Sequence, residues 1–325
     1  MEIFYLILQN MWFFAIPLLV VALGGMFSER SGIVNIALEG IMLFGAFWGC
    51  MFLYWTSEGT GSGIMSGQLQ LILALLIAGG SGALYSLLHA YASIDMNADQ
   101  TISGTALNLF STAFVIFFAR LFTSNHVQQI KIPSTSFHID SIPLLSKIPF
   151  IGPLLFENTY ITTYIGIIIL VIAWFVLYKT RFGLRLISCG EFPQAADAAG
   201  ISVRKMRYAG VIISGFLAGM GGLIFIIPTS VELNGTVAGY GFLALAVLIF
   251  GQWKPLRIFY SALFFGFMKT IASVYMVIPF LANLGLPSQF YKMIPYIATI
   301  IVLAISSKNS HAPAAEGIPF DSGKR

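Results

Sequence analysis

Long apolar runs recur along this 325-residue sequence, and they constrain its fold more than any other feature. A helix needs about 20 apolar residues to cross about 30 Å of hydrocarbon. Within lipid, every backbone polar group needs a partner inside the protein, and a helix supplies these partners itself. The sequence therefore predicts an all-α polytopic membrane protein with about nine transmembrane helices. The candidate runs are 4–27, 33–56, 69–92, 101–123, 160–178, 207–227, 237–251, 258–280 and 291–306.

The charge content excludes a soluble fold. Only 9% of the residues are Asp, Glu, Lys or Arg and 58% are hydrophobic, whereas a soluble domain carries about 25% charged residues. So few charges cannot cover the surface of a 35.5 kDa globule. The apolar start over 3–27 lacks a basic region and a small-residue cleavage site, which favours a retained span over a signal peptide.

The excess of basic residues, with a net charge of +4, predicts the orientation of the chain rather than a nucleic-acid partner. The segment 179–207 holds six Lys or Arg against two acidic residues, and a short turn adds Lys254 and Arg257. Because basic loops stay on the cytoplasmic side, we assign both of these and the tail 307–325 to that side. Alternating spans then place the N-terminus and the loop 124–158 outside. The basic residues of the tail are Lys308, Lys324 and Arg325.

Cysteines and histidines indicate neither a disulfide nor a metal site. Cys50 is predicted to lie near the outer surface and Cys189 in a cytoplasmic loop, so we expect no bridge between them. The four histidines are scattered without the spacing of metal ligands.

Two glycine-rich stretches, 24–49 and 221–251, resemble each other and run in opposite directions across the membrane. Each begins with a Gly-Gly pair, meets a polar break and resumes as an apolar helix. This arrangement predicts an inverted repeat, with the substrate path at its interface. We expect one transmembrane domain, in which residues 1–123 and 160–306 form the two halves. Glycines spaced four apart predict close helix crossings.

Polar residues in and near these breaks are candidates for the substrate pathway. Asn35 and Glu39 lie four residues apart and share a helix face, and a carboxylate at membrane depth normally faces a cavity or a partner. The alternative is that such groups only satisfy the backbone of broken helices. Lys269 lies mid-span and either snorkels to the surface or pairs with an anionic group such as Glu39. The candidates are Asn35, Glu39, Gln100, Thr101, Asn108, Glu232, Asn234 and Tyr240.

The segment 179–207 contains a short predicted helix over 193–199, with proline in its first turn and Gly200 as its stop. A small alanine-rich helix of this kind suits docking into a groove of a cytosolic protein. The alternative is an ordinary loop whose charges only fix the topology.

The pattern G-L-R-x-x-x-x-G-E-x-P-x-A-A-x-x-A-G-I from Gly183 to Ile201 resembles the coupling segment of ABC importer permeases, closest to the branched-chain amino acid, ribose and nucleoside class. Residues 23–47 and 98–109 resemble signatures of the nucleoside-type permeases. Phe192 stands where that family usually has Asn, so the local docking contacts differ.

This resemblance implies a type II ABC importer permease in the cytoplasmic (inner) cell membrane. It implies a cytosolic ABC ATPase and an external substrate-binding lipoprotein as partners. It also implies a second permease subunit, in a heterodimer with a longer permease or, less often, in a homodimer. The sequence contains no G-x-x-x-x-G-K-[ST] loop, so we expect no enzymatic site or cofactor of its own, with ATP bound by the partner ATPase. The expected ATPase-coupling residues are Glu191, Pro193, Ala195, Ala196, Asp197 and Gly200.

The resemblance favours nucleosides as the solute. Ribose, other sugars and branched-chain amino acids remain alternatives within the same class. An ion-coupled secondary transporter is a further alternative, suggested by the inverted repeat and the two glutamates of the breaks. An intramembrane enzyme ranks far lower, because the sequence offers no nucleophile or paired carboxylates at useful spacing.

Overall fold

The structure is a computed structural model of the chain. It describes residues 2–57, 67–123, 129–132, 134–143, 146, 148–149, 151–278, 281, 283–306 and 312–320. Lys147 of the predicted external loop lies outside the described residues, as do the tail residues Lys308, Lys324 and Arg325.

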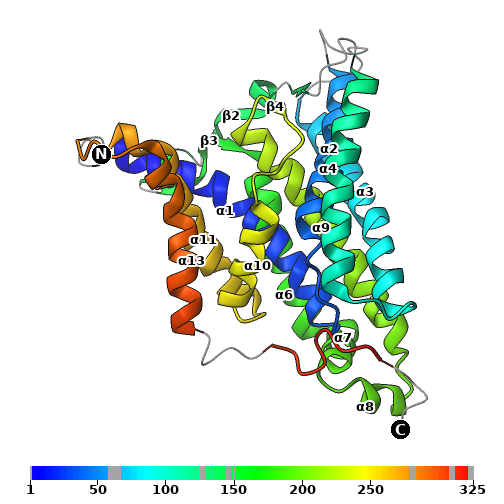
Figure 1. The fold of residues 1–325 in the computed structure, drawn as a ribbon. Coiled ribbons are helices and arrows are strands. Elements are labelled where there is room, and N and C mark those ends of the chain that lie inside the picture. Colours follow the sequence, from blue (N-terminus) through cyan, green and yellow to red (C-terminus); the bar gives the residue numbers. More distant parts are fainter. Residues whose placement is uncertain are drawn as a thin grey trace.

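The nine apolar runs correspond one to one with helices (Figure 1). Within the described residues, 7 of these helices are long and apolar enough to cross a membrane, while α10 is too short to do so alone. This confirms the polytopic helical fold. The helices are α1 (Glu2–Glu29), α2 (Leu38–Thr56), α3 (Gln68–Ile94), α4 (Gln100–Phe122), α6 (Ile161–Lys179), α9 (Val203–Thr229), α10 (Tyr240–Phe250), α11 (Pro255–Val274) and α13 (Ser288–Ser306).

Short elements occupy the two ends of the bundle. The β-strands gather at one end, whereas two short helices of the segment 179–207 lie at the opposite end (Figure 1). This separation agrees with the predicted sidedness. At the first end, β1 (Ile130–Lys131) pairs antiparallel with β4 (Glu232–Leu233), and β2 (His138–Ser141) pairs antiparallel with β3 (Glu157–Tyr160). The remaining short elements are η1 (Ser134–Phe137), α5 (Ile151–Leu155), α7 (Arg181–Glu191), α8 (Pro193–Ala198) and η3 (Tyr275–Val277).

The core consists of α1, α2, α3 and α9, and glycines let these helices approach closely. A Cβ added at Gly82 of α3 would lie 2.4 Å from the carbonyl oxygen of Gly215 in α9. One added at Gly45 of α2 would lie 2.3 Å from the Cα of Gly219. Real Cβ atoms do not approach so closely, so these crossings exclude any side chain larger than hydrogen. The glycine spacing therefore identifies crossing points correctly.

Replacing Gly82 with valine should destabilise the bundle, since α3 and α9 would have to separate. Overpacking of a tight core costs about 1–3 kcal/mol or more. The expected result is a lower unfolding temperature in detergent and a loss of monodisperse protein. Gly80→Val is the matched control, because a Cβ at Gly80 of the same helix meets no atom within 4 Å. Equal melting temperatures for the two variants would contradict this account of the crossing.

Candidate functional site

Each half of the chain contains a broken helix where the sequence predicts one. The first break covers residues 30–37 between α1 and α2, and the second covers 230–239 between α9 and α10. Gly32 and Gly239 have φ values of 97° and 76° in the left-handed region, which glycine adopts without strain. The second break runs from β4 to the start of α10 part-way along the bundle (Figure 1).

Glu39 joins the two breaks. Its carboxylate accepts hydrogen bonds from the N–H groups of Gly239 at 2.9 Å and Gly241 at 2.6 Å. These amides begin α10, where free N–H groups and the helix dipole favour an anion. A Cβ at Gly241 would lie 2.4 Å from the Cα of Glu39, so only glycine permits this approach. Glu39 is thus the cap of a helix 200 residues further along the chain.

The amide of Asn108 satisfies the backbone of the first break. Its Oδ1 accepts from the N–H of Gly40 at 2.7 Å, and its Nδ2 donates to the carbonyl of Ile36 at 2.9 Å. The Oε1 of Gln100 likewise accepts from the N–H of Val34 at 2.8 Å. For these two residues of α4, the structure supports the alternative in which polar side chains supply the partners that a broken helix has lost.

His89 also supports the first break, although it is not among the pathway candidates predicted from the sequence. This side chain is fully buried, with Nε2 2.9 Å from the carbonyl of Val34 and Nδ1 3.1 Å from the hydroxyl of Ser103. Because a carbonyl only accepts, the proton lies on Nε2 and Nδ1 accepts from Ser103. The sequence signal that could have identified His89 is a polar side chain within an otherwise apolar run.

Asn35 and Thr101 differ in their surroundings. Asn35 is fully buried, and its Nδ2 donates to the hydroxyl of Ser214 in α9 at 2.9 Å. Its Oδ1 has no hydrogen-bond partner among the described residues. Thr101 is exposed on α4, and its backbone N–H donates to Asp99, the cap of that helix. The structure therefore does not bring Thr101 together with the other candidates.

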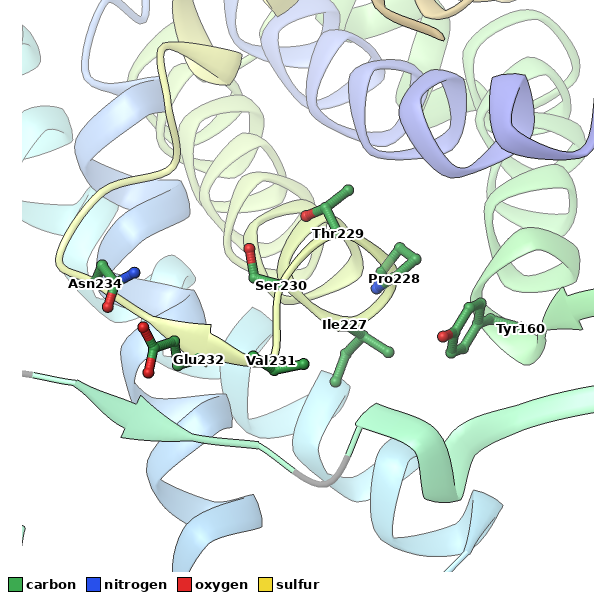
Figure 2. Close-up of a pocket in the computed structure, with 8 residues that line it drawn as sticks. All are labelled: Tyr160, Ile227, Pro228, Thr229, Ser230, Val231, Glu232 and Asn234. Carbon is green, nitrogen blue, oxygen red and sulfur yellow. The ribbon is translucent and has the colours of Figure 1, made fainter. Parts of the chain in front are cut away.

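Glu232 and Asn234 line a cavity of about 410 Å³ at the end of the bundle that carries the strands. Figure 2 shows the residues of its wall, which come from the end of α9, the second break and β3. The wall consists of Tyr160, Ile227, Pro228, Thr229, Ser230, Val231, Glu232 and Asn234.

Tyr240 lies apart from this cavity, buried against Phe225 with ring centroids 3.9 Å apart. The ammonium of Lys269 lies 5.1 Å from the ring centroids of both Tyr240 and Tyr296. It also lies near enough to Glu39 for their charges to interact. For Lys269 the structure therefore favours partners inside the bundle over snorkelling.

At the opposite end, the predicted short helix is present as α8 and stops before Gly200, which has a φ of 79°. Its residues face two directions. Ala195 and Asp197 are exposed, whereas Pro193 and Ala196 are buried within the chain. A partner protein could therefore contact Ala195 and Asp197 directly but not Ala196.

Glu191 points back toward the bundle. Its carboxylate forms a salt bridge of 3.3 Å with Arg30 of the first break. Arg30 also donates to the carbonyl of Trp253, in the turn that follows α10. This end of α7 is thus tied through Arg30 to the first break and to the turn after α10. Phe192, which follows directly, is 69% exposed.

Residues 312–320, which we call the C-terminal strap, lie across the same end of the molecule. The sequence predicted only a tail here. The N–H of Ala315 donates to the carbonyl of Gly190 at 2.8 Å, and the N–H of Gly317 donates to that of Gly32 at 3.0 Å. The strap therefore contacts both α7 and the first break.

Within the strap, the Glu316 carboxyl faces the buried Glu29 carboxyl, and a hydrogen bond between them requires a proton on one of the two. Burial raises the pKa of Glu316 to about 7, although the hydrogen bond with Glu29 and the nearby Arg30 both oppose this rise. The indole N–H of Trp253 donates to Oε2 of the Glu29 carboxyl.

Removing the hydrogen-bond donor of Asn108 should destabilise the first break. Asn108→Asp keeps the acceptor for Gly40 but leaves the carbonyl of Ile36 facing a carboxylate. An unpaired buried polar group costs about 1–3 kcal/mol, so we expect a lower unfolding temperature and impaired transport. Thr112→Val is the control, because Thr112 is exposed on α4 and its hydroxyl donates to the carbonyl of Asn108 in the same helix. An unchanged melting temperature for Asn108→Asp would contradict the assigned role.

Docking of the C-terminal strap should weaken as the pH rises from about 4.5 to about 7. In this window the docked strap holds a proton that a free Glu316 would release, so raising the pH favours release, by at most about tenfold per pH unit. Above this window the dependence should level off. The measurement is amide hydrogen exchange at Ala315 and Gly317 between about pH 5.5 and 7.5, corrected for intrinsic rates. Glu316→Gln should reduce the slope, although Glu29 remains beside it, and an unchanged slope would refute the assignment.

A family described as the branched-chain amino acid transport system permease component matches residues 7–303. The guanosine ABC transporter permease protein NupQ of Bacillus subtilis is 42% identical over 96% of this chain and 95% of its own. The nucleoside ABC transporter permease protein NupC of Lactococcus lactis is 42% identical over 98% of both chains. NupB of the same organism, named likewise, is 25% identical over 89% of this chain and 76% of its own. Among solved structures, an ABC transporter in an inward-facing conformation has the same fold, with a TM-score of 0.52, 15% identity, and coverage of 92% of this chain and 85% of that one.

Proposed function

The chain belongs to the family of branched-chain amino acid transport system permease components, and from this premise we propose that it is the permease subunit of an ATP-driven importer of nucleosides. The observation that carries the choice of solute is the 42% identity, over nearly the whole chain, to permeases named for guanosine and for nucleosides. Two relatives of similar length that agree in substrate class favour nucleosides over sugars and amino acids.

The external cavity suits the entry of such a solute. Its volume of about 410 Å³ falls within the range of about 300–1,000 Å³ of small-molecule sites. A nucleoside presents a planar base and hydroxyl groups. Tyr160 offers an aromatic ring for the base, and Ser230, Glu232 and Asn234 offer hydrogen-bonding groups for the hydroxyls. Contacts of this kind support capture of a polar, uncharged molecule.

From this cavity, the second break leads inward to the start of α10, where Glu39 joins it to the first break. We assign the passage of the solute to this junction. The first turns of α2 and α10 form its sides, next to the ends of the two breaks. A small shift between α2 and α10 would therefore change the width of the junction without breaking a helix.

Energy would enter at the other end of the molecule. The exposed face of α8, with Ala195 and Asp197, is suited to contact a cytosolic ABC ATPase. Closure of two ATPase subunits would displace α8, and the salt bridge between Glu191 and Arg30 would pass this displacement to the first break. The ATP would be bound by the ATPase and not by this chain.

The proposed assembly has further partners. A second permease subunit would complete the pathway, and two permeases named for nucleosides, NupB and NupC, occur together in one organism among the relatives. An external substrate-binding lipoprotein would deliver the solute at the end that carries the cavity. The location would be the cytoplasmic (inner) cell membrane.

Uptake measurements test the proposal. Cells that contain the chain with its partner subunits should take up radiolabelled guanosine or uridine in competition with other nucleosides, but not with ribose or leucine. Uptake should stop when ATP is depleted and continue in the presence of an ionophore. Competition by leucine or ribose alone would contradict the assignment of nucleosides as the solute. Uptake that survives ATP depletion but collapses with an ionophore would instead indicate a secondary transporter.

Asp197→Arg tests the contact with the ATPase in the same system. The variant should lose ATP-driven uptake and should no longer retain the ATPase during purification. Asp140→Arg makes the same change of charge at the opposite end of the molecule, where the Asp140 side chain is 96% exposed, and it should retain the ATPase. If both variants retained it equally, α8 would not be the docking helix.

A further inference from the structure

The C-terminal strap touches every cytoplasmic element that the proposed mechanism uses. Besides its bonds to Gly190 and Gly32, the N–H of Ala314 donates to Glu191 at 3.3 Å. The Glu191 carboxylate therefore lies between Arg30 and the strap. A segment that is far away in sequence thus bridges the end of α7 and the first break at three points.

Arg207 of α9 anchors the far end of the C-terminal strap. Its side chain is among the largest that are fully buried, and its Nη1 donates to the carbonyl of Ile318 at 3.1 Å. A Cβ at Gly32 would lie 3.0 Å from the Nη2 of Arg207. The guanidinium is therefore enclosed between the first break and the strap.

No described side chain neutralises Arg207, and its Nε and Nη2 have no hydrogen-bond partner among the described residues. An enclosed cation is costly unless surrounding groups hold it in place. The bond from Arg207 to the carbonyl of Ile318 is therefore one of the contacts that hold this cation, and it fixes the far end of the strap against α9.

Phe320 connects the C-terminal strap to the proposed docking helix. It packs on a small buried cluster formed by Cys189 of α7, Ala196 of α8 and Val203 of α9. Its ring centroid also lies 6.0 Å from the Arg207 guanidinium. α8 has only 6 residues, and an isolated helix of that length is not stable in water. Its position therefore depends on this packing.

We propose that the C-terminal strap couples α8 to the first break. It holds α8 at a fixed place relative to this break, so that a displacement of α8 also moves Gly32 and Arg30. This inference rests on the proposed function, because it requires an ATPase that acts on α8. Without the strap, α8 would still bind the ATPase, but the movement of α8 would not reach the first break. The expected defect is therefore a loss of coupling rather than a loss of ATPase binding.

The test compares transport with ATP hydrolysis. Phe320→Ala is reconstituted with all partner subunits in proteoliposomes, and nucleoside uptake is measured per ATP hydrolysed. Hydrolysis should stay within about twofold of the wild type, while uptake per ATP falls at least about fivefold. Phe320→Leu should restore most of the ratio because it refills the cluster. Ile318→Ala is the matched control within the strap, since the Ile318 side chain is 54% exposed and only its backbone carbonyl binds Arg207.

Cys189 reports the position of the C-terminal strap directly. It is fully buried beside Phe320, so maleimide labelling in a Cys50→Ala background should be slow in the parent and several times faster with Phe320→Ala. If Phe320→Ala does not fold, Gly317→Val replaces it. Gly317 has a φ of 73°, so valine would distort the strap there without touching α8.

The outcomes separate the two proposals. An unchanged ratio of uptake to hydrolysis, unchanged Cys189 labelling, or equal defects in Phe320→Ala and Phe320→Leu would each overturn the coupling role of the strap. A wild-type complex that showed no ATP-driven nucleoside uptake would instead overturn the proposed function, and the coupling role with it.

Discussion

Backbone polar groups within lipid must find partners inside the protein, and the carboxylate of Glu39 meets this need at the point where two broken helices come together. Its bonds to Gly239 and Gly241 attach α2 to the start of α10, which has no preceding helical turn of its own. The remaining polar side chains of the interior extend this arrangement. Asn108, Gln100 and His89 supply the first break with the partners that regular helix would have provided.

The glycine crossings make this arrangement possible. Because α2, α3 and α9 approach at Gly45, Gly82 and Gly219, the breaks lie within reach of side chains from neighbouring helices. Close packing in membranes depends on such small residues, since lipid gives helices little hydrophobic reason to associate. The rigid crossings and the hydrogen-bonded breaks therefore form one unit, in which the irregular segments are the parts that can change conformation.

The sequence predicts the helices well, because the length of an apolar run and the position of proline or glycine are local properties. Each of the nine apolar runs corresponds to a helix, and α8 begins at Pro193 as expected. The sequence also identifies Asn108 and Gln100, because polar residues are conspicuous in an apolar run. It leaves open whether Glu39 caps a helix or pairs with Lys269, since its partners lie 200 residues away. The C-terminal strap has neither periodicity nor length, so only the fold shows where it binds.

The shortness of α10 has an electrical consequence. Its 11 residues rise about 16 Å, so its positive end lies inside the bilayer rather than at the surface, close to the ammonium of Lys269. Moving one elementary charge through 100 mV of membrane potential is worth about 2.3 kcal/mol, and every open pathway is therefore a possible leak. A cation would meet the ammonium of Lys269 at this depth, and an anion would find the α10 amides already bound to Glu39. An uncharged solute would meet neither obstacle, so the passage proposed at this junction would admit such a solute while the membrane stays insulated.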